Sequence, residues 1–270
     1  MMLIEDKISD EAPSPVHRVA DLLLDIGLVL LVSGAHCGRV SRNLERVAKH
    51  WGYQMELFMS FTGLSVHIWH REHPDQQIDR FRRCPLPGVH FGIVTEISLL
   101  TWRVVEENLA IDEVETRMAG IRKLSHHPRW LTLSGTGSAC ACLCLLTGGN
   151  WVDGGITFVA AVCGLFLRQE VVKARFNPLI SFIVASFVTT LIASGDAIYQ
   201  IGQSPEKALA TSVLYLVPGV PLINCIIDLI EGHLPTAIAR GVFGGLILLC
   251  IAVGMALAIL LIGVHHFRPQ

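Results

Sequence analysis

The sequence predicts an α-helical polytopic membrane protein in which five transmembrane helices follow a cytoplasmic α+β domain. Charged residues concentrate before Pro128, and five long uncharged stretches follow it as far as Val264. The mean hydropathy of the whole chain is +0.52, although its first half has the composition of an ordinary soluble protein. We therefore expect a polar tail over residues 1–16, the α+β domain over 17–127 and a membrane domain over 128–270.

A helix needs ~20 apolar residues to cross the hydrocarbon core of a bilayer, and four of the five stretches reach that length. The stretches cover residues 130–152, 154–167, 176–195, 208–227 and 241–264. The second is short, but Trp151, Gly154 and Gly155 can start its helix at the membrane interface. We therefore count it as a span.

Lysines and arginines beside the spans predict the orientation, because loops rich in these residues stay in the cytoplasm. With the α+β domain inside, the inner flanks hold seven such residues and the outer flanks two. The inner ones are Arg122, Lys123, Arg129, Arg168, Lys173, Arg175 and Arg240, and the outer ones are Lys207 and Arg268. The sequence thus predicts a cytoplasmic N-terminal domain, and five spans then place the C-terminus on the outer side of the membrane.

Residue periodicity predicts the elements of the α+β domain. Apolar residues recur at helical spacing over 17–31 and 40–51, and then alternate with polar ones over 53–59 and 64–68. This change of period is typical of two helices followed by a β-hairpin. A third strand over 78–84 and helices over 90–108 and 112–123 complete the order ααβββαα.

Several classes of function are not favoured. The net charge of −2 and the lack of a basic tract argue against nucleic-acid binding. The polar opening of the chain predicts no cleaved signal peptide. Cys37 and His36, in a helix-to-helix turn, could be a catalytic nucleophile and its base. Neighbours in sequence need not direct their side chains toward each other, however, and no third orienting group is evident. His67 and His70 could suggest a metal site, but they lie on opposite sides of a predicted strand. We therefore predict no catalytic residue, no metal site and no cofactor.

The fourth stretch contains the most informative intramembrane feature. Pro218 and Pro221 flank Gly219, and prolines in a helix remove backbone donors and interrupt it. Transporters place substrates at the half-helix ends that such breaks create. The alternative is a packing kink that binds nothing.

These residues also carry a resemblance to a known family. The run VPGVPLIN at 217–224 with Asp228 and Arg240, the run SGAHCGRV at 33–40 and the segment PGVHFGIVTE at 87–96 resemble the signature of the threonine/serine exporter family. Within it, HPRWL at 127–131 and SACACLC at 138–144 are most similar to the YjjP-type subgroup. The chain departs from the pattern of many relatives at His36, Cys37 and His90, so the chemistry of the α+β domain does not transfer.

The resemblance implies a subunit of a secondary exporter for a small carboxylate, succinate, that acts with a second five-span YjjB-type membrane subunit. Fused relatives carry two such units, so this chain corresponds to half a transporter within an oligomer. One alternative is a threonine/serine exporter. Others are a membrane-anchored hydrolase-like enzyme and a channel or scaffold.

On this reading, the candidate transport residues are Pro218, Gly219, Pro221, Asn224, Asp228, Arg240 and Arg168. Asn224 and the backbone amides near Gly219 would meet carboxylates. Asp228 and Asp196 are candidates for a proton relay, or they mark interfaces. Arg168 and Arg240 would attract an anion or anchor the topology.

Overall fold

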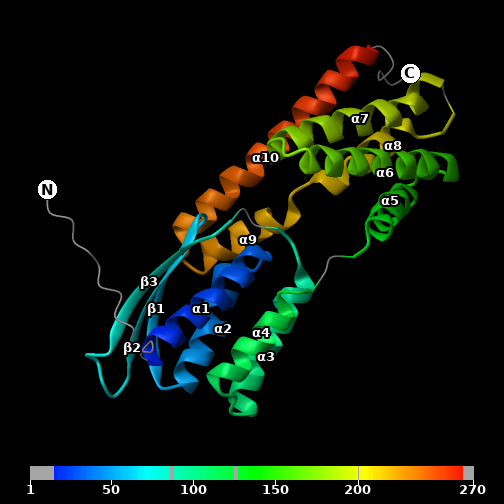
Figure 1. The fold of residues 1–270 in the computed structure, drawn as a ribbon. Helices are drawn as coiled ribbons and strands as arrows, with labels where there is room; N and C mark the ends of the chain where they lie inside the picture. The colour runs from blue at the N-terminus through cyan, green and yellow to red at the C-terminus, as the bar shows by residue number, and fades with distance from the viewer. Residues whose placement is uncertain (1–14, 86–87, 125–126, 200, 264–270) are drawn as a thin grey trace, which may run out of the picture. The chain divides into compact units, whose positions relative to one another are not determined.

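The computed structural model describes residues 15–85, 88–124, 127–199 and 201–263, so most of the expected N-terminal tail and the C-terminus lie outside the described residues. The chain forms two compact units (Figure 1). The N-terminal unit groups Met1–Ser125 with Val220–Arg240, and the membrane unit groups His126–Gly219 with Gly241–Gln270. Residues 220–240 thus pack with the N-terminal residues, and the boundary expected between residues 127 and 128 remains a prediction.

The N-terminal unit contains the predicted elements in the predicted order. They are α1 (Pro15–Val32), α2 (Cys37–His50), β1 (Tyr53–Ser60), β2 (Gly63–His70), β3 (Gln77–Arg83), α3 (Phe91–Glu106) and α4 (Ile111–Ile121). The strands form an antiparallel sheet in the order β1-β2-β3, with Leu57 opposite Val66 and Ile68 opposite Ile78. The order ααβββαα is confirmed.

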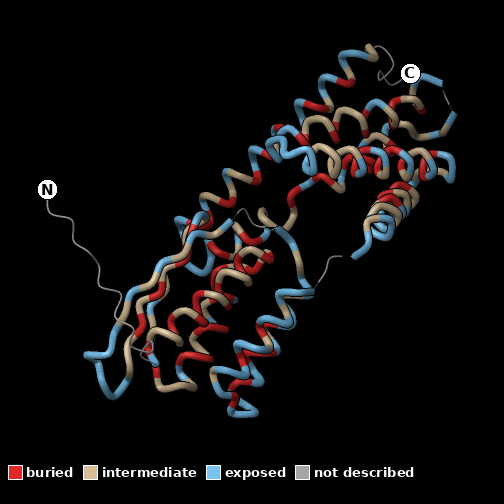
Figure 2. The backbone as a smooth tube through the Cα atoms, viewed as in Figure 1, coloured by how far each residue is buried: buried red, intermediate tan, exposed pale blue. Residues whose placement is uncertain are grey.

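The core of this unit lies between the helices and the sheet. Helix α1 packs against β2 and β3, and α2 packs against β1. The buried stretch of α1 includes Leu23, Ile26 and Leu30, which are fully inaccessible to solvent (Figure 2). Leu64 and Ile68 of β2 are equally buried on the facing side of the sheet. The apolar face of the helix and the apolar face of the sheet, which the two periods of the sequence predict, thus pack against each other in one layer.

Two glycines set the turns around α2. Gly34 has φ +94° between α1 and α2, and Gly52 has φ +81° just after α2. Residues with a Cβ adopt such angles only with strain, so glycine is favoured at both positions. His36 begins α2 as its N-cap, because its side chain accepts a hydrogen bond from the Arg39 N–H.

Two more helical segments complete the N-terminal unit. They are α9 (Gly219–Ile230) and the first residues of α10 (Leu234–Ile262). Asn224 and Asp228 form the buried side of α9, whereas Ile223, Ile226 and Ile230 are exposed on its other side. The polar side of α9 therefore packs inward, and its apolar side is left for lipid or another protein.

Among its described residues, the membrane unit contains helices joined by turns and no strand. It contains α5 (Arg129–Leu146), α6 (Trp151–Lys173), α7 (Pro178–Tyr199), α8 (Pro205–Ser212), the short 3-10 helix η1 (Leu214–Leu216) and most of α10. An apolar cluster from α7, α10 and the η1 region includes Phe182, Leu216 and Ile251. Small residues let α7 and α10 pack closely. A side chain at Gly254 would collide with Ser186, because its Cβ would lie 2.0 Å from the Ser186 hydroxyl oxygen.

Three helices in the described chain, α6, α7 and α10, are long and apolar enough to cross a membrane. The segments Pro205–Leu216 and Gly219–Ile230 add a fourth if this bent pair counts as one broken span. Helix α6 covers the short second stretch of the sequence analysis. Helix α5, which covers the first, is not apolar enough to count as a span, because its first half contains Arg129 and is rich in Gly, Ser and Thr. The structure therefore supports three or four spans.

Candidate functional site

Three of the predicted transport residues bind one backbone turn. The Asn224 side chain donates to the Gly34 carbonyl at 2.8 Å, and the Arg240 guanidinium donates to the Ala35 carbonyl at 2.9 Å. Asp228 accepts the Cys37 N–H at 2.7 Å. We call Asn224, Asp228 and Arg240 the turn-binding cluster. It satisfies backbone groups between α1 and α2 that would otherwise be buried without partners.

The centre of the cluster is a buried ion pair. Arg240 Nη1 lies 2.8 Å from Asp228 Oδ2, and the two side chains are 7% and 0% exposed. Each charge also binds a backbone group, as described above, so both are paired and hydrogen-bonded. Such pairs are strongly destabilised when one partner is removed, because the other charge stays buried.

A second set of charges surrounds this pair. Glu231 accepts hydrogen bonds from Arg42 at 3.0 Å and contacts His36 Nδ1 at 3.1 Å. Partial burial acts to raise the pKa of Glu231, but its hydrogen bonds with Arg42 and His36 outweigh this effect, and the pKa lies below its usual value. Gly38 leaves room for the carboxylate, since a Cβ there would lie 2.0 Å from Glu231 Oε2.

His36, Asp228 and Glu231 place potential metal ligands within 4.8 Å of one another. The two carboxylates already pair with Arg240 and Arg42. A divalent cation would have to displace these guanidinium groups, so the donor set favours an ionic network over a metal centre.

The geometry does not favour Cys37 as a catalytic nucleophile. The residue is fully buried, and burial together with the charge of Asp228 raises the pKa of its thiol to about 12. A reactive cysteine needs a lowered pKa and access to substrate. His36 instead caps α2 and contacts Glu231.

The two prolines lie at the beginning of α9. Val217 is extended, with φ −60° and ψ 125°, as expected of a residue before proline. Helix α9 then begins at Gly219, so Pro221 occupies its first turn, where a missing N–H breaks no helical bond. The break is therefore a helix end followed by a helix start, and amides of the first turn of α9 have no partner within the helix.

Arg168 lies in the membrane unit, on α6. Its guanidinium stacks over the Phe182 ring at 4.2 Å, and its Nε is buried without a hydrogen-bond partner in the described chain. No acidic side chain among the described residues forms a salt bridge with it. Nearby, the hydroxyls of Thr189 and Tyr215 lie 3.0 Å apart. A Cβ at Gly164 would lie within 2.4 Å of both hydroxyl oxygens.

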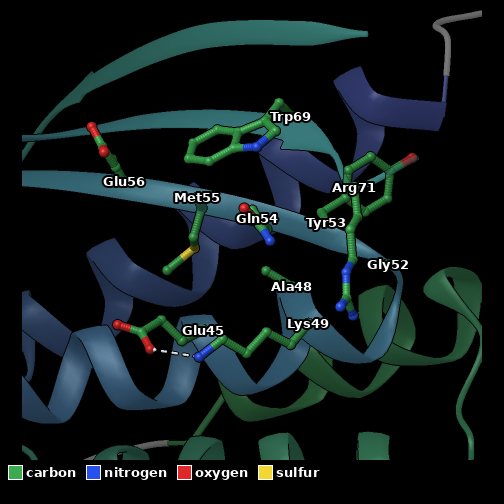
Figure 3. Close-up of a pocket in the computed structure, with 10 residues that line it drawn as sticks. All are labelled: Glu45, Ala48, Lys49, Gly52, Tyr53, Gln54, Met55, Glu56, Trp69 and Arg71. Carbon is green, nitrogen blue, oxygen red and sulfur yellow. Dashed lines mark hydrogen bonds and ion pairs between the residues drawn. The ribbon is translucent and has the colours of Figure 1, made fainter. Parts of the chain in front are cut away.

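A hollow of about 580 Å³ lies on the N-terminal unit between α2 and the first two strands (Figure 3). Its lining includes Glu45, Lys49, Tyr53 and Trp69, and Glu45 pairs with Lys49 at 3.2 Å. The lining contains no serine, cysteine or histidine, so it does not hold a Ser–His or Cys–His pair.

Sequence reasoning missed the partners of the predicted residues. The turn carbonyls of Gly34 and Ala35 lie about 200 positions from the side chains that bind them, and no local pattern indicates such pairs. Thr236 likewise donates to the Met59 carbonyl at 2.8 Å.

The sequence matches a known family and two relatives over most of its length. Residues 21–262 match the sequence profile of the family described as "Putative threonine/serine exporter". The chain is 30% identical to "Probable succinate transporter subunit YjjP" of Klebsiella aerogenes, over 93% of this chain and 97% of that one. It is also 30% identical to the protein of that name in Escherichia coli, over 92% and 96%.

A third relative is longer. "Probable threonine/serine exporter" of Mycobacterium tuberculosis is 24% identical over 83% of this chain but only 42% of its own length. No solved structure matches the chain. The relatives are named as transporters, and the apolar helices are those of a membrane protein. The family match covers most of the sequence, and the chain therefore belongs to the threonine/serine exporter family of membrane exporters.

Proposed function

We propose that this chain is one subunit of a bacterial inner-membrane secondary exporter for a small carboxylate, succinate, and acts with a second, YjjB-type subunit. The observation that carries the choice of a carboxylate is Arg168, a cation of the membrane unit that lacks an acidic partner among the described residues. The names of the two 30% identical relatives support succinate.

An ionisable side chain in a membrane helix is costly unless it is paired, and it marks a functional site by default. A guanidinium also matches the geometry of a carboxylate, because two N–H groups can donate in parallel. The Nε of Arg168 is free for such a bond, and the hydroxyls of Thr189 and Tyr215 lie nearby. We propose that Arg168 binds one carboxylate of succinate.

The turn-binding cluster acts as a gate in this proposal. Asn224 can bind substrate only if its bond to the Gly34 carbonyl opens, and the same holds for Arg240 and Ala35. A substrate carboxylate would then compete with the turn for these donors. Pro218, Gly219 and Pro221 would supply the helix end from which free amides face the substrate.

The lengths and names of the relatives support the proposal of a partner. This chain spans almost the whole of the YjjP relatives, which are named as subunits, but less than half of the Mycobacterium protein. We propose five spans, with α5 as the first and the bent pair as the fourth, a cytoplasmic N-terminal domain and a periplasmic C-terminus. An odd number of spans would place a second such unit in inverted orientation, as in inverted-repeat transporters.

Export of threonine or serine is the second candidate, favoured by the family description and by the Mycobacterium relative. A zwitterion needs an anion to meet its ammonium group as well as a cation to meet its carboxylate. The lack of an acidic partner for Arg168 among the described residues favours the dicarboxylate.

Export of labelled succinate from cells that carry both subunits tests the role of Arg168. We expect Arg168→Gln to reduce the rate at least tenfold, because a charge-assisted hydrogen bond to substrate is lost. Arg175→Gln removes an exposed charge from the same end of α6 and should leave export near its original rate. Equal rates in wild type and Arg168→Gln would contradict the proposal, and preferential export of threonine would favour the second candidate.

A further inference from the structure

Two carboxyl groups of the membrane unit meet away from Arg168. Asp153 lies in the first turn of α6 and Asp196 in the last turn of α7, and they are 0% and 1% exposed. A Cβ at Gly202 would lie 1.8 Å from Asp153 Oδ1 and 2.7 Å from Asp196 Oδ2. The two acids therefore converge on one point, and glycine at 202 leaves the space for them.

One oxygen of each acid is well bonded and the other is not. Asp153 Oδ2 accepts the Asn150 N–H at 2.8 Å, and Asp196 Oδ1 accepts the Gly202 N–H at 2.6 Å. Asp153 Oδ1 has only a 3.4 Å contact with the Ser204 N–H. Asp196 Oδ2 is buried and has no donor among the described residues. The two undersupplied oxygens, Asp153 Oδ1 and Asp196 Oδ2, both lie close to the position of Gly202.

Two buried carboxylates side by side cannot both stay ionised without a large cost, and a shared proton removes it. The helix ends determine which acid keeps the charge. Asp153 caps the N-terminus of α6, where negative charge is stabilised, whereas Asp196 lies near the C-terminus of α7, where it is not.

The other ionisable groups nearby do not neutralise the pair. Glu206, in the first turn of α8, adds negative charge. Lys207 directs its ammonium group to the Gly148 carbonyl at 2.9 Å. Tyr199 on α7 is exposed, and Cys144 on α5 is a buried thiol.

We propose that Asp153 and Asp196 form a proton-binding pair, in which Asp196 Oδ2–H donates to Asp153 Oδ1 and the proton is exchanged with water. An apolar hollow of about 410 Å³ borders Asp196. Use of this proton to drive export rests on the proposed function, whereas binding of the proton does not.

Infrared spectroscopy of the purified full chain in lipid nanodiscs tests the pair. At pH 7 the wild type should show the C=O stretching band of one buried protonated carboxyl. Asp196→Asn should lose the band, because its amide N–H can take the place of the shared proton. Asp153→Asn should also lose it, since Asp196 then ionises beside an amide donor. The control Glu206→Gln should retain it.

Three results would overturn the proposal: no such band in the wild type, a band that survives in Asp196→Asn, or a band that survives in Asp153→Asn. Stabilisation of the wild type by sodium ions at pH 7 in the absence of the band would assign the site to a metal cation instead. A parallel export assay separates this question from the proposed function. If no carboxylate is exported but the band behaves as expected, the proton site stands and the exporter assignment fails.

Discussion

At the scale of single residues, the most buried ion pair of the chain is Asp228 with Arg240. Asp228 and Arg240 together accept and donate three hydrogen bonds, one between themselves and one each to the turn before α2. An isolated buried charge is costly, but each of these two charges pairs with the other and also binds a backbone group. The pair therefore links the turn at residues 34–37 to α9 and α10 within one compact unit.

Removing one member of this pair should be costly. We expect Asp228→Asn and Arg240→Met each to lower the free energy of unfolding by about 3 to 5 kcal/mol, because each leaves a buried partner unpaired. The double variant should lose clearly less than the sum of the two. Unfolding of the purified variants in detergent would measure this. Glu231→Gln, at the partly exposed edge of the network, should cost less than either, and strictly additive losses would show that the pair is not coupled.

At the scale of elements, α9 reverses the usual pattern of a soluble helix. Asn224 and Asp228 face inward to the turn, while Ile223, Ile226 and Ile230 are exposed. The absence of charge over 208–227 predicted a span here, and Pro218 and Pro221 predicted a break within it. The break at Val217 is a local effect of Pro218 and was expected. The inward direction of the polar side depends on the distant turn, which no local pattern reveals.

The prolines offer a test of the broken element. Replacing both Pro218 and Pro221 by Ala frees Val217 to become helical and lets one helix run through the break. We expect succinate export to fall at least tenfold while the amount of protein in the membrane stays near normal. Pro221→Ala alone should have a smaller effect, because Pro221 already lies in a helical first turn. Undiminished export by the double variant would reduce the break to a packing kink.

At the scale of the whole molecule, the sequence predicted the order of the elements but not the grouping of the chain. Hydrophobic periodicity located the helices and strands of the N-terminal unit, because their buried faces repeat locally. Residues 220–240 join that unit through bonds to residues about 190 positions earlier. Arg168 was predicted, but its isolation from acidic partners became visible only in three dimensions. The expected division at residue 127 stays a prediction about domains.

The most direct test of the account is transport by purified components. Lipid vesicles loaded with labelled succinate would contain this chain, a YjjB-type five-span protein, or both. We predict that only the vesicles with both proteins release succinate at a substantial rate, and that Arg168→Gln abolishes most of this release. Full transport by this chain alone would contradict the two-subunit account. No transport by the correctly inserted pair would contradict succinate as the substrate.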